Sequence, residues 1–247
     1  MFDLTGKTAL ITGSGRGVGA GIARALSAQG ASVAINDYFP ERADELVAEL
    51  KAQGVTAMAV PFDVTDMAAV QAGIAQVEAT LGPVDILVNN VGTLPHGMMP
   101  TPFLKAPVEE WSKHVDNNLY GTLNCCKCVA ASMSERGWGR IIAISSDAAR
   151  VGHYGSTVYG AAKAAMEGLM RTLAKELGRK GVTANSIVLG LIDTVPEDFS
   201  KGAEKYFSTG RIGTPADIGA AAVYLASEEA GWVTGHSLVV NGGFFGA

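Results

Sequence analysis

The segment Thr8–Gly19, TALITGSGRGVG, joins a short apolar strand to a glycine-rich turn and the start of a helix. Such glycines permit a tight turn and let backbone N–H groups approach a pyrophosphate, which also faces the positive end of the helix dipole. The spacing is G-x-x-x-G-x-G instead of the commoner G-x-G-x-x-G, so the glycines alone are weak evidence. The strand–turn–helix context is what a dinucleotide-binding turn requires, and it favours that interpretation.

The rest of the chain repeats this alternation of strand and helix. The predicted strands are Thr8–Thr12, Ser32–Asn36, Thr56–Val60, Asp85–Asn89, Arg140–Ser145, Val182–Val188 and Ser237–Val240. The predicted helices are Val18–Gly30, Glu41–Gln53, Asp66–Leu81, about Pro107–Arg136, Thr157–Arg179 and Pro215–Ala226. The strands are apolar on both faces, as in a parallel sheet covered by helices. We therefore predict a doubly wound, Rossmann-type α/β fold of about seven strands, with residues 1–247 forming one domain.

Composition narrows the function classes. A net charge of -5 and a pI of about 5.4 argue against nucleic-acid binding, which uses clustered cations. We expect no membrane span and no signal peptide, because the sequence has neither a long apolar run nor a basic segment before an apolar core. Cys125, Cys126 and Cys128 are too clustered for a disulfide framework or a zinc site, so we predict buried thiols, no metal and a cytoplasmic protein.

Asp37 lies at the end of the second predicted strand, where a carboxylate can accept hydrogen bonds from the adenosine ribose of NAD. The same charge would repel the 2′-phosphate of NADP. Arg16, in the glycine turn, favours NADP instead, because a cation there could hold that phosphate. We predict NAD as the cofactor, with NADP the less favoured choice; a helix-capping role is the simpler alternative for Asp37.

Tyr159 and Lys163 form Tyr-x-x-x-Lys at the start of a predicted helix. Residues i and i+4 share a helix face, so the ammonium can lie beside the phenol and lower its pKa from about 10. The pair by itself arises often by chance. Ser146, at the carboxyl end of the preceding strand, adds a hydroxyl that can hold a substrate oxygen near Tyr159. Ser145 is the adjacent alternative, and spacing alone does not separate the two.

Together these residues resemble the short-chain dehydrogenase/reductase family along the whole chain. TGSGRGVG, the Asp63-Val64 pair, Asn89-Asn90-Val91-Gly92 and the tail GHSLVVNGG are similar to family motifs. The resemblance implies Asn118, Ser146, Tyr159 and Lys163 as the catalytic residues. The cofactor-binding residues that we assign are Gly13, Ser14, Arg16, Gly17, Val18, Gly19, Asp37, Tyr38, Asp63, Val64, Asn90, Val91, Gly92, Tyr159, Lys163, Gly190, Ile192 and Thr194.

The chain departs from the family at two positions: Val91 replaces an alanine, and Leu189 replaces a proline before Gly190. The resemblance implies hydride transfer between nicotinamide and a carbonyl carbon, with Tyr159 as general acid/base and Ser146 fixing the oxygen. It also implies that Lys163 lowers the pKa of Tyr159 and binds the nicotinamide ribose, and that Asn118 holds a water. The expected assembly is a homotetramer, formed through the cysteine helix, the Tyr159 helix and the terminal strand.

Two loops, Thr93–Ala106 and Val195–Gly210, follow the carboxyl ends of strands, where α/β sheets bind ligands. With the stretch between Ser146 and Tyr159, they predict an apolar pocket for a small alcohol or ketone, either cyclic or hydroxyacyl-like. The candidate lining residues are His96, Met98, Met99, Phe103, His153, Tyr154, Val195, Phe199, Tyr206 and Phe207. Simple packing is the alternative for each aromatic residue.

Two other functions compete with an NAD-dependent dehydrogenase. The first is an NADPH-dependent 3-oxoacyl reductase acting on an acidic acyl carrier protein. Arg16 favours it, as does a basic helix face that could hold the carrier: Arg171, Lys175, Arg179 and Lys180. Most such faces are simply solvated, and Asp37 argues against NADPH. The second is a catalytically silent dinucleotide sensor, which would lack one of the catalytic residues; none is missing here.

Overall fold

The computed structural model describes residues 1–92, 100–195 and 200–245. Its parallel sheet has seven strands in the order β3-β2-β1-β4-β5-β6-β7. The strands are β1 (Thr8–Ile11), β2 (Ser32–Ile35), β3 (Ala57–Ala59), β4 (Ile86–Asn89), β5 (Gly139–Ser146), β6 (Val182–Leu189) and β7 (Ser237–Val240). The order reverses between β1 and β4, so the doubly wound fold is confirmed.

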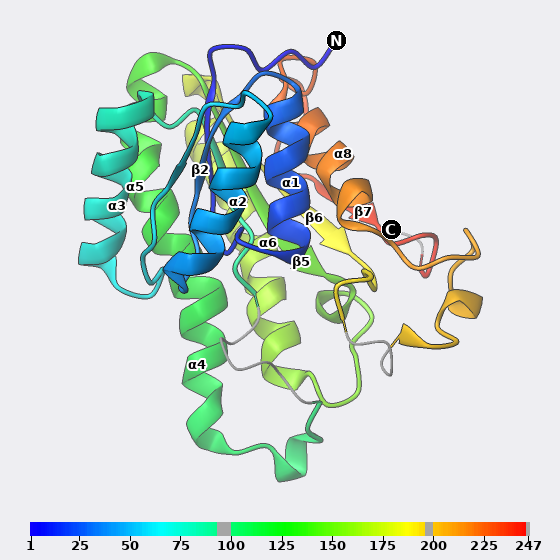
Figure 1. Cartoon of the computed structure of the whole chain (residues 1–247). Helices are drawn as coiled ribbons and strands as arrows, with labels where there is room; N and C mark the ends of the chain where they lie inside the picture. The colour runs from blue at the N-terminus through cyan, green and yellow to red at the C-terminus, as the bar shows by residue number, and fades with distance from the viewer. Residues whose placement is uncertain (93–99, 196–199, 246–247) are drawn as a thin grey trace.

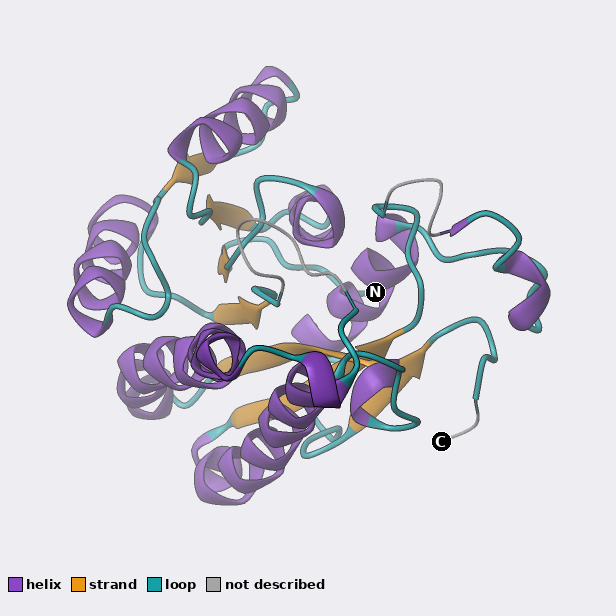
Figure 2. Ribbon diagram, turned by 90° about the horizontal axis from the view of Figure 1, so that it is seen from below, coloured by secondary structure: helices purple, strands orange, loops and turns teal. Residues whose placement is uncertain are grey.

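Helices cover both faces of the sheet (Figures 1 and 2). The long ones are α1 (Gly17–Ala28), α2 (Pro40–Ala52), α3 (Met67–Leu81), α5 (Gly121–Arg136), α6 (Thr157–Leu177) and α8 (Pro215–Ala226). Helices α1, α2 and α8 share one apolar cluster with the sheet, and α3, α5 and α6 share the other. Leu10 faces the second cluster while Ile11 faces the first, which explains why these short strands are apolar throughout.

Local sequence explains several helix ends. The side chain of Asp66 accepts hydrogen bonds from the N–H groups of Ala68 and Ala69, which caps α3. Thr214 and Asp217 form a capping box at the start of α8, next to Pro215 in its first turn. Gly137 ends α5 with a φ of 72°, in the left-handed region that glycine tolerates best.

The helix predicted over Pro107–Arg136 differs from expectation. A single-turn 3-10 helix (Val108–Glu110) precedes α4 (Trp111–Val115), and a π-helical turn over Asp116–Tyr120 separates α4 from α5. All of these residues keep right-handed helical backbone at the junctions, so the chain runs on without a break. A π turn inserts one extra residue into a helix and is frequent at functional sites. Here it contains Asn118.

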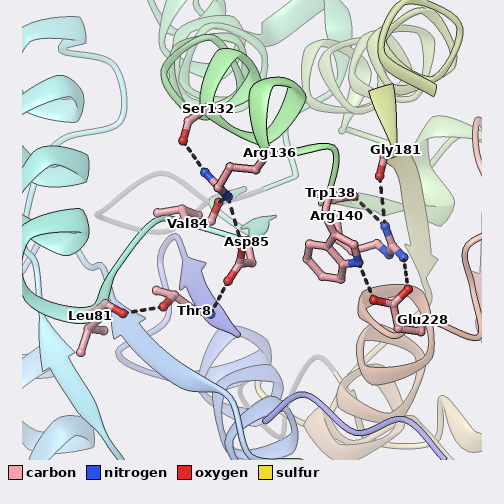
Figure 3. A network of polar contacts seen from close by, with 11 residues as sticks. Thr8, Leu81, Val84, Asp85, Ser132, Arg136, Trp138, Arg140, Gly181 and Glu228 are labelled. Carbon is pink, nitrogen blue, oxygen red and sulfur yellow. Dashed lines mark hydrogen bonds and ion pairs between the residues drawn. The ribbon is translucent and has the colours of Figure 1, made fainter. Parts of the chain in front are cut away.

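A polar network closes the amino end of the sheet (Figure 3). Buried Arg140, at the start of β5, lies 3.5 Å from a carboxylate oxygen of Glu228 and stacks on Trp138, whose indole N–H donates to Glu228. Arg136 pairs with Asp85 at 3.2 Å. These contacts join β4, β5 and the segment after α8 at the end opposite the glycine turn, and we assign them to stability.

Candidate active site

The glycine turn follows β1 and adopts backbone that only glycine takes easily. Gly13 and Gly17 both have a φ of 59°. At Gly19 a Cβ atom would lie 2.6 Å from Nδ2 of Asn90 and 2.7 Å from the Gly13 carbonyl oxygen, so a side chain has no room. Helix α1 begins at Gly17, and no side chain caps its first N–H groups. Those donors, together with the dipole of a 12-residue helix, suit a pyrophosphate.

Buried amides hold this turn in shape. Nδ2 of Asn90 donates to the carbonyl oxygens of Thr12 and Gly13, at 3.0 and 2.8 Å. Oδ1 of Asn36 accepts a hydrogen bond from the N–H of Gly13, at 3.3 Å. The hydroxyl of Ser14 donates to the Ile11 carbonyl, at 2.8 Å. Asn90 and Ser14 therefore shape the turn with their side chains, and the backbone N–H of Ser14 also serves the turn by donating to the Asn36 carbonyl at 2.7 Å.

The carboxylate of Asp37 lies beside the turn, two residues beyond the end of β2. Its oxygens accept hydrogen bonds from the N–H groups of Gly15 and Phe39, both at 3.1 Å. Arg42 lies 3.9 Å away and stacks over the Phe39 ring at 4.0 Å. Arg42 was not predicted as a site residue, although it lies in the first turn of α2, the helix that follows β2. The ribose end of the candidate site thus contains an anion and a cation side by side, with Tyr38 exposed next to them.

The Asp63-Val64 pair follows β3. The Asp63 carboxylate accepts hydrogen bonds from the backbone N–H and the hydroxyl of Thr65, both at 2.8 Å. Nδ2 of Asn124, on α5, donates to the carbonyl of buried Val64 at 3.0 Å. These contacts fix the segment at the edge of the site, where the resemblance places adenine.

The chemistry-bearing side chains meet at the carboxyl end of β5. Ser146 is its last residue, and Tyr159 lies in the first turn of α6. The Ser146 hydroxyl lies close enough to Tyr159 to act to lower the pKa of its phenol. Lys163 follows one turn later and is 2% exposed. The structure thus places Ser146, Tyr159 and Lys163 near the carboxyl end of β5, whereas the Ser145 hydroxyl donates to Glu167 at 2.7 Å.

Lys163 does not contact the phenol in the cofactor-free structure, which differs from the predicted pairing. Its Nζ donates to the carbonyl of Ile144 at 2.7 Å and to that of Val91 at 3.5 Å, and it lies 5.8 Å from the centre of the Tyr159 ring. Burial lowers the pKa of Lys163 to about 7. Burial also raises the pKa of Tyr159, against the influence of Ser146. Without a cofactor, therefore, the hydroxyl of Ser146 favours the phenolate, and Lys163 does not.

Asn118 lies in the π turn and is fully buried. Its Nδ2 donates to the His114 carbonyl at 2.9 Å, while its Oδ1 has no partner. A Cβ atom at Gly92 would lie 2.6 Å from Nζ of Lys163 and 3.6 Å from Oδ1 of Asn118. Gly92 therefore leaves open a small space that the two side chains border. An orphaned buried acceptor beside a lysine suits a bound water or hydroxyl group.

Three further predicted residues follow β6. Thr194 lies across from the glycine turn, because a Cβ atom at Gly17 would be 3.5 Å from its methyl group. Gly190 packs against Asp147 and Asn241, where a Cβ atom would lie 3.1 Å from each side chain. Buried Ile192 forms a bridge to Gly213 that anchors the segment. Leu189, the departure from the family pattern, is the last residue of β6 and packs on the apolar cluster.

Val91, the other departure, packs against the second cluster, and its Cγ2 would lie 3.0 Å from a Cβ atom at Gly13. The residues fit a nicotinamide dinucleotide from end to end. Uncapped N–H groups and glycines at α1 suit the pyrophosphate, and Gly92 keeps space open beside Lys163 and Asn118. No group of His, Cys, Asp and Glu within the described ranges could hold a metal ion.

Of the predicted substrate residues, His96, Met98, Met99 and Phe199 lie outside the described residues. His153 packs edge-on against Phe244, with ring centres 6.2 Å apart, and Phe244 lies 5.7 Å from Phe207. Phe103 stacks on Trp111, while Tyr154, Val195 and Tyr206 are exposed. Phe244 belongs to this aromatic group, although no motif or spacing in the sequence predicts it.

These features define a nicotinamide-dependent oxidoreductase of the Rossmann type, and comparison with known proteins agrees. A family model described as enoyl-(acyl carrier protein) reductase matches residues 13–245. The chain belongs to the short-chain dehydrogenase/reductase family. It is 41% identical to nodulation protein G of Azospirillum brasilense, over 96% of this chain and 97% of the relative. It is 39% identical to an acetoacetyl-CoA reductase of Rhizobium meliloti, over 96% and 98%.

A solved gluconate 5-dehydrogenase from Burkholderia cenocepacia, in complex with NADP and tartrate, superimposes with a TM-score of 0.91 at 35% identity, covering 98% of this chain and 96% of that one. A putative gluconate dehydrogenase from Agrobacterium tumefaciens gives 0.93 at 31% identity, covering 98% and 97%. In residues 1–92, 100–195 and 200–245, no helix is long and apolar enough to cross a membrane.

Proposed function

We propose that this protein is an NAD(H)-dependent oxidoreductase that interconverts a secondary alcohol and a ketone, with Tyr159 as general acid/base. The observation that carries the proposal is the position of Ser146 at the carboxyl end of β5, close enough to Tyr159 on α6 to act on the pKa of its phenol. Lys163 lies one turn along α6, and its Nζ donates to the carbonyl of Val91, which lies beside Gly13 in the glycine turn. The names of the relatives, which include reductases and dehydrogenases, support the same class.

The bound nicotinamide supplies or accepts the hydride. Ser146 donates a hydrogen bond to the substrate oxygen and stabilises the negative charge that develops there. Tyr159 gives its proton to that oxygen during reduction and takes it back during oxidation. Lys163 and Oδ1 of Asn118 border the space at Gly92, where a water can receive the proton from Tyr159 and pass it toward solvent. The Lys163 ammonium would also hold the nicotinamide ribose when the cofactor is bound.

The test is Tyr159→Phe, which keeps the ring and removes the proton donor. We expect turnover to fall by at least about 10³-fold, because positioned acid–base catalysis contributes about 10²–10⁴-fold. NAD(H) affinity should stay within about twofold. Tyr224→Phe, on α8 against Phe2, is the matched control and should keep wild-type activity. Retained activity in Tyr159→Phe would refute the assignment, and it would also show that the silent-sensor alternative is wrong.

The preference for NAD rests on Asp37. Its carboxylate is held by two backbone N–H groups at the strand end, where ribose hydroxyls are bound in this fold. We would titrate NADH and NADPH against the wild type and Asp37→Ala. Tighter NADH binding that weakens in the variant supports the proposal. Tighter NADPH binding by the wild type would show that Arg16 and Arg42 outweigh the carboxylate.

That second outcome would favour an NADPH-dependent 3-oxoacyl reductase. Arg42 is the structural observation in its favour, because its guanidinium lies 3.9 Å from Asp37, within reach of a 2′-phosphate. Names among the relatives, acetoacetyl-CoA reductase and 3-oxoacyl-[acyl-carrier-protein] reductase, point the same way. Acetoacetyl-CoA and cyclohexanol are the two probes that separate the candidates. Preferential reduction of the thioester with NADPH would make the biosynthetic reductase the better assignment.

A homotetramer in a reducing, cytoplasmic compartment belongs to the same proposal. Strand β7 is the edge of the sheet with all four residues only partly buried, and Trp232 just before it is 98% exposed. Cys125 and Cys126 are buried free thiols, as predicted for a helix in the core, whereas Cys128 is only partly buried. Sedimentation equilibrium should give four times the chain mass of 25.5 kDa. A monomeric mass would contradict the assembly without touching the active-site assignment.

A further inference from the structure

Glu167 is a buried carboxylate on α6 that the mechanism above does not use. It is 3% exposed and lies one helical turn after Lys163. Its neighbours on the buried face of α6, Met166 and Met170, are apolar. Burying a carboxylate costs several kcal/mol unless it is paired and hydrogen-bonded. An apolar residue in its place often gives equal or greater stability. A carboxylate at this position therefore calls for a reason beyond packing.

The contacts of Glu167 all lead to the segments around Ser146. Oε1 accepts a hydrogen bond from the hydroxyl of Ser145 at 2.7 Å. Oε2 accepts from Nε of Arg150 at 2.8 Å, lies 2.6 Å from its Nη2, and accepts from the Ser237 hydroxyl at 3.0 Å. One carboxylate thus joins α6 to the end of β5, to the turn that follows it and to the start of β7.

Ser145 and Ser146 are adjacent, and their partners lie at different levels of α6. Ser145 donates to Glu167, while Ser146 lies close enough to Tyr159 to act on the pKa of its phenol. Two turns of α6 separate these partners, a rise of about 12 Å. The bond from Ser145 to Glu167 limits how far β5 can slide along α6. It consequently sets the separation of Ser146 from Tyr159.

Arg150 holds the other side of the same serine. Arg150 is the C-cap of the short 3-10 turn Asp147–Ala149, and Ser146 is its N-cap. The hydroxyl of Ser146 accepts a hydrogen bond from the N–H of Ala148 at 3.2 Å, so the turn orients the catalytic hydroxyl. The guanidinium of Arg150 contacts Oε2 of Glu167 with two nitrogens, Nε and Nη2. Releasing it would free the turn and let the hydroxyl rotate.

We propose that Glu167 and Arg150 are positioning residues that lock the Ser145–Arg150 segment onto α6 and so hold Ser146 beside Tyr159. The inference rests on the proposed function for its kinetic consequence, but its geometric content is independent of any substrate. A misplacement of about 1 Å at a reacting group can cost about 10²-fold in rate. The pair therefore acts on kcat and leaves the cofactor site unchanged.

The test uses Glu167→Met and Arg150→Met, which replace the pair by unbranched apolar side chains of similar length. With NADH and acetoacetyl-CoA, or NAD and cyclohexanol, kcat should fall about 10- to 100-fold in each variant. The double variant should lose no more than the single ones, because both act through one contact. Glu167→Gln keeps the acceptor for Ser145 and should recover part of the rate. NADH affinity should not change.

Glu228→Gln is the matched control, because Glu228 pairs with Arg140 at the opposite end of the same strand (Figure 3). It should lower the melting temperature and leave kcat unchanged. If Glu167→Met also lowers only the melting temperature, with full kcat in the folded enzyme, Glu167 is structural and the positioning proposal is wrong.

A measurement that does not depend on turnover separates failure of the positioning proposal from failure of the proposed function. The ¹³Cζ resonance of Tyr159, assigned by its loss in Tyr159→Phe, reports hydrogen bonding of the phenol. We expect it to shift in Glu167→Met and Arg150→Met and to stay in place in Glu228→Gln. An unchanged resonance in all three variants overturns the positioning role, whether or not the wild type turns over either probe. A shifted resonance in a protein without turnover supports the positioning role and counts against the proposed function alone.

Discussion

Nδ2 of Asn241 donates a 3.3 Å hydrogen bond to Oδ1 of Asp147, which lies 94 residues earlier in the chain. Asp147 directly follows Ser146 and is 2% exposed, and a Cβ atom at Gly190 would lie 3.1 Å from its other oxygen. One buried carboxylate thus connects the catalytic strand, the loop after β6 and the C-terminal segment. Burial raises its pKa from 3.8 to about 6, against the hydrogen bond from Asn241.

The first prediction follows from the sign of that shift. The folded protein holds a proton on Asp147 up to about pH 6, whereas the unfolded chain releases it near pH 3.8. The stabilisation that this bound proton contributes is therefore complete below pH 3.8 and is lost as the pH rises through about 6. Asp147→Asn should be more stable than the wild type by up to about 3 kcal/mol above pH 6, and by less at pH 4. Urea denaturation at both pH values measures the difference; equal differences would contradict the raised pKa.

Lys163 gives a second prediction of opposite pH direction. Burial lowers its pKa from 10.5 to about 7, so between these values the unfolded chain binds a proton that the folded protein does not. Stability rises with pH across that window. The cofactor-free Lys163→Met variant should therefore exceed the wild type in melting temperature most clearly at pH 7, with a gap that narrows toward pH 10. It should also lose turnover, as expected where stability was given up for function.

A difference in melting temperature between Lys163→Met and the wild type that stayed constant with pH would contradict the lowered pKa of Lys163 in the cofactor-free protein. Gly168→Ala, on the same helix with only the far end of Arg171 nearby, serves as a control whose stability difference should not depend on pH.

Local patterns predicted most of the fold. Strand β7 and helix α8 have the predicted ends, and the glycine turn identified the first strand and helix, because these features depend on neighbours in the chain. The helix over Pro107–Arg136 is the exception. Apolar spacing does not reveal a single extra residue in a helix, so the π turn at Asn118 was not predicted.

The candidate site divides in the same way. Tyr159 and Lys163 share a helix face, and spacing alone places them together. The partners of Glu167 come from β5, the following turn and β7, and Asp147 meets Asn241 at a separation of 94 residues. Such contacts exist only once the sheet has formed, so no local signal marks them. Helix spacing likewise does not reveal that Lys163 bonds to two backbone carbonyls instead of the phenol in the absence of a cofactor.

Gly92→Ala tests the space between Lys163 and Asn118. The new Cβ atom would lie 2.6 Å from Nζ and 3.1 Å from Cε of Lys163. The shorter distance is below the contact distance between a Cβ atom and any non-bonded heavy atom. Because Lys163 is enclosed, its ammonium must leave the Ile144 carbonyl. We expect kcat to fall about 10²-fold with a small change in melting temperature. Gly168→Ala should keep full activity and gain up to about 1 kcal/mol from helix propensity. Wild-type kcat in Gly92→Ala would show that Lys163 has room to move.

The aromatic group of His153, Phe207 and Phe244 carries the last prediction. Phe244 lies between the two other rings, and Asn241 fixes its segment by accepting a hydrogen bond from the N–H of Gly243 at 3.1 Å. His153 lies between Ser146 and Tyr159 in sequence, so we expect this group to border the substrate. Phe244→Ala should then raise KM for cyclohexanol about 10-fold, as expected when an apolar contact of 1–3 kcal/mol is lost. Phe244→Leu should recover most of the affinity because it restores apolar area. Since the ring contacts of Phe244 are with His153 and Phe207, kcat should change less than KM. An effect on kcat alone would place Phe244 outside the substrate contacts and make it a support for the segment after Ser146.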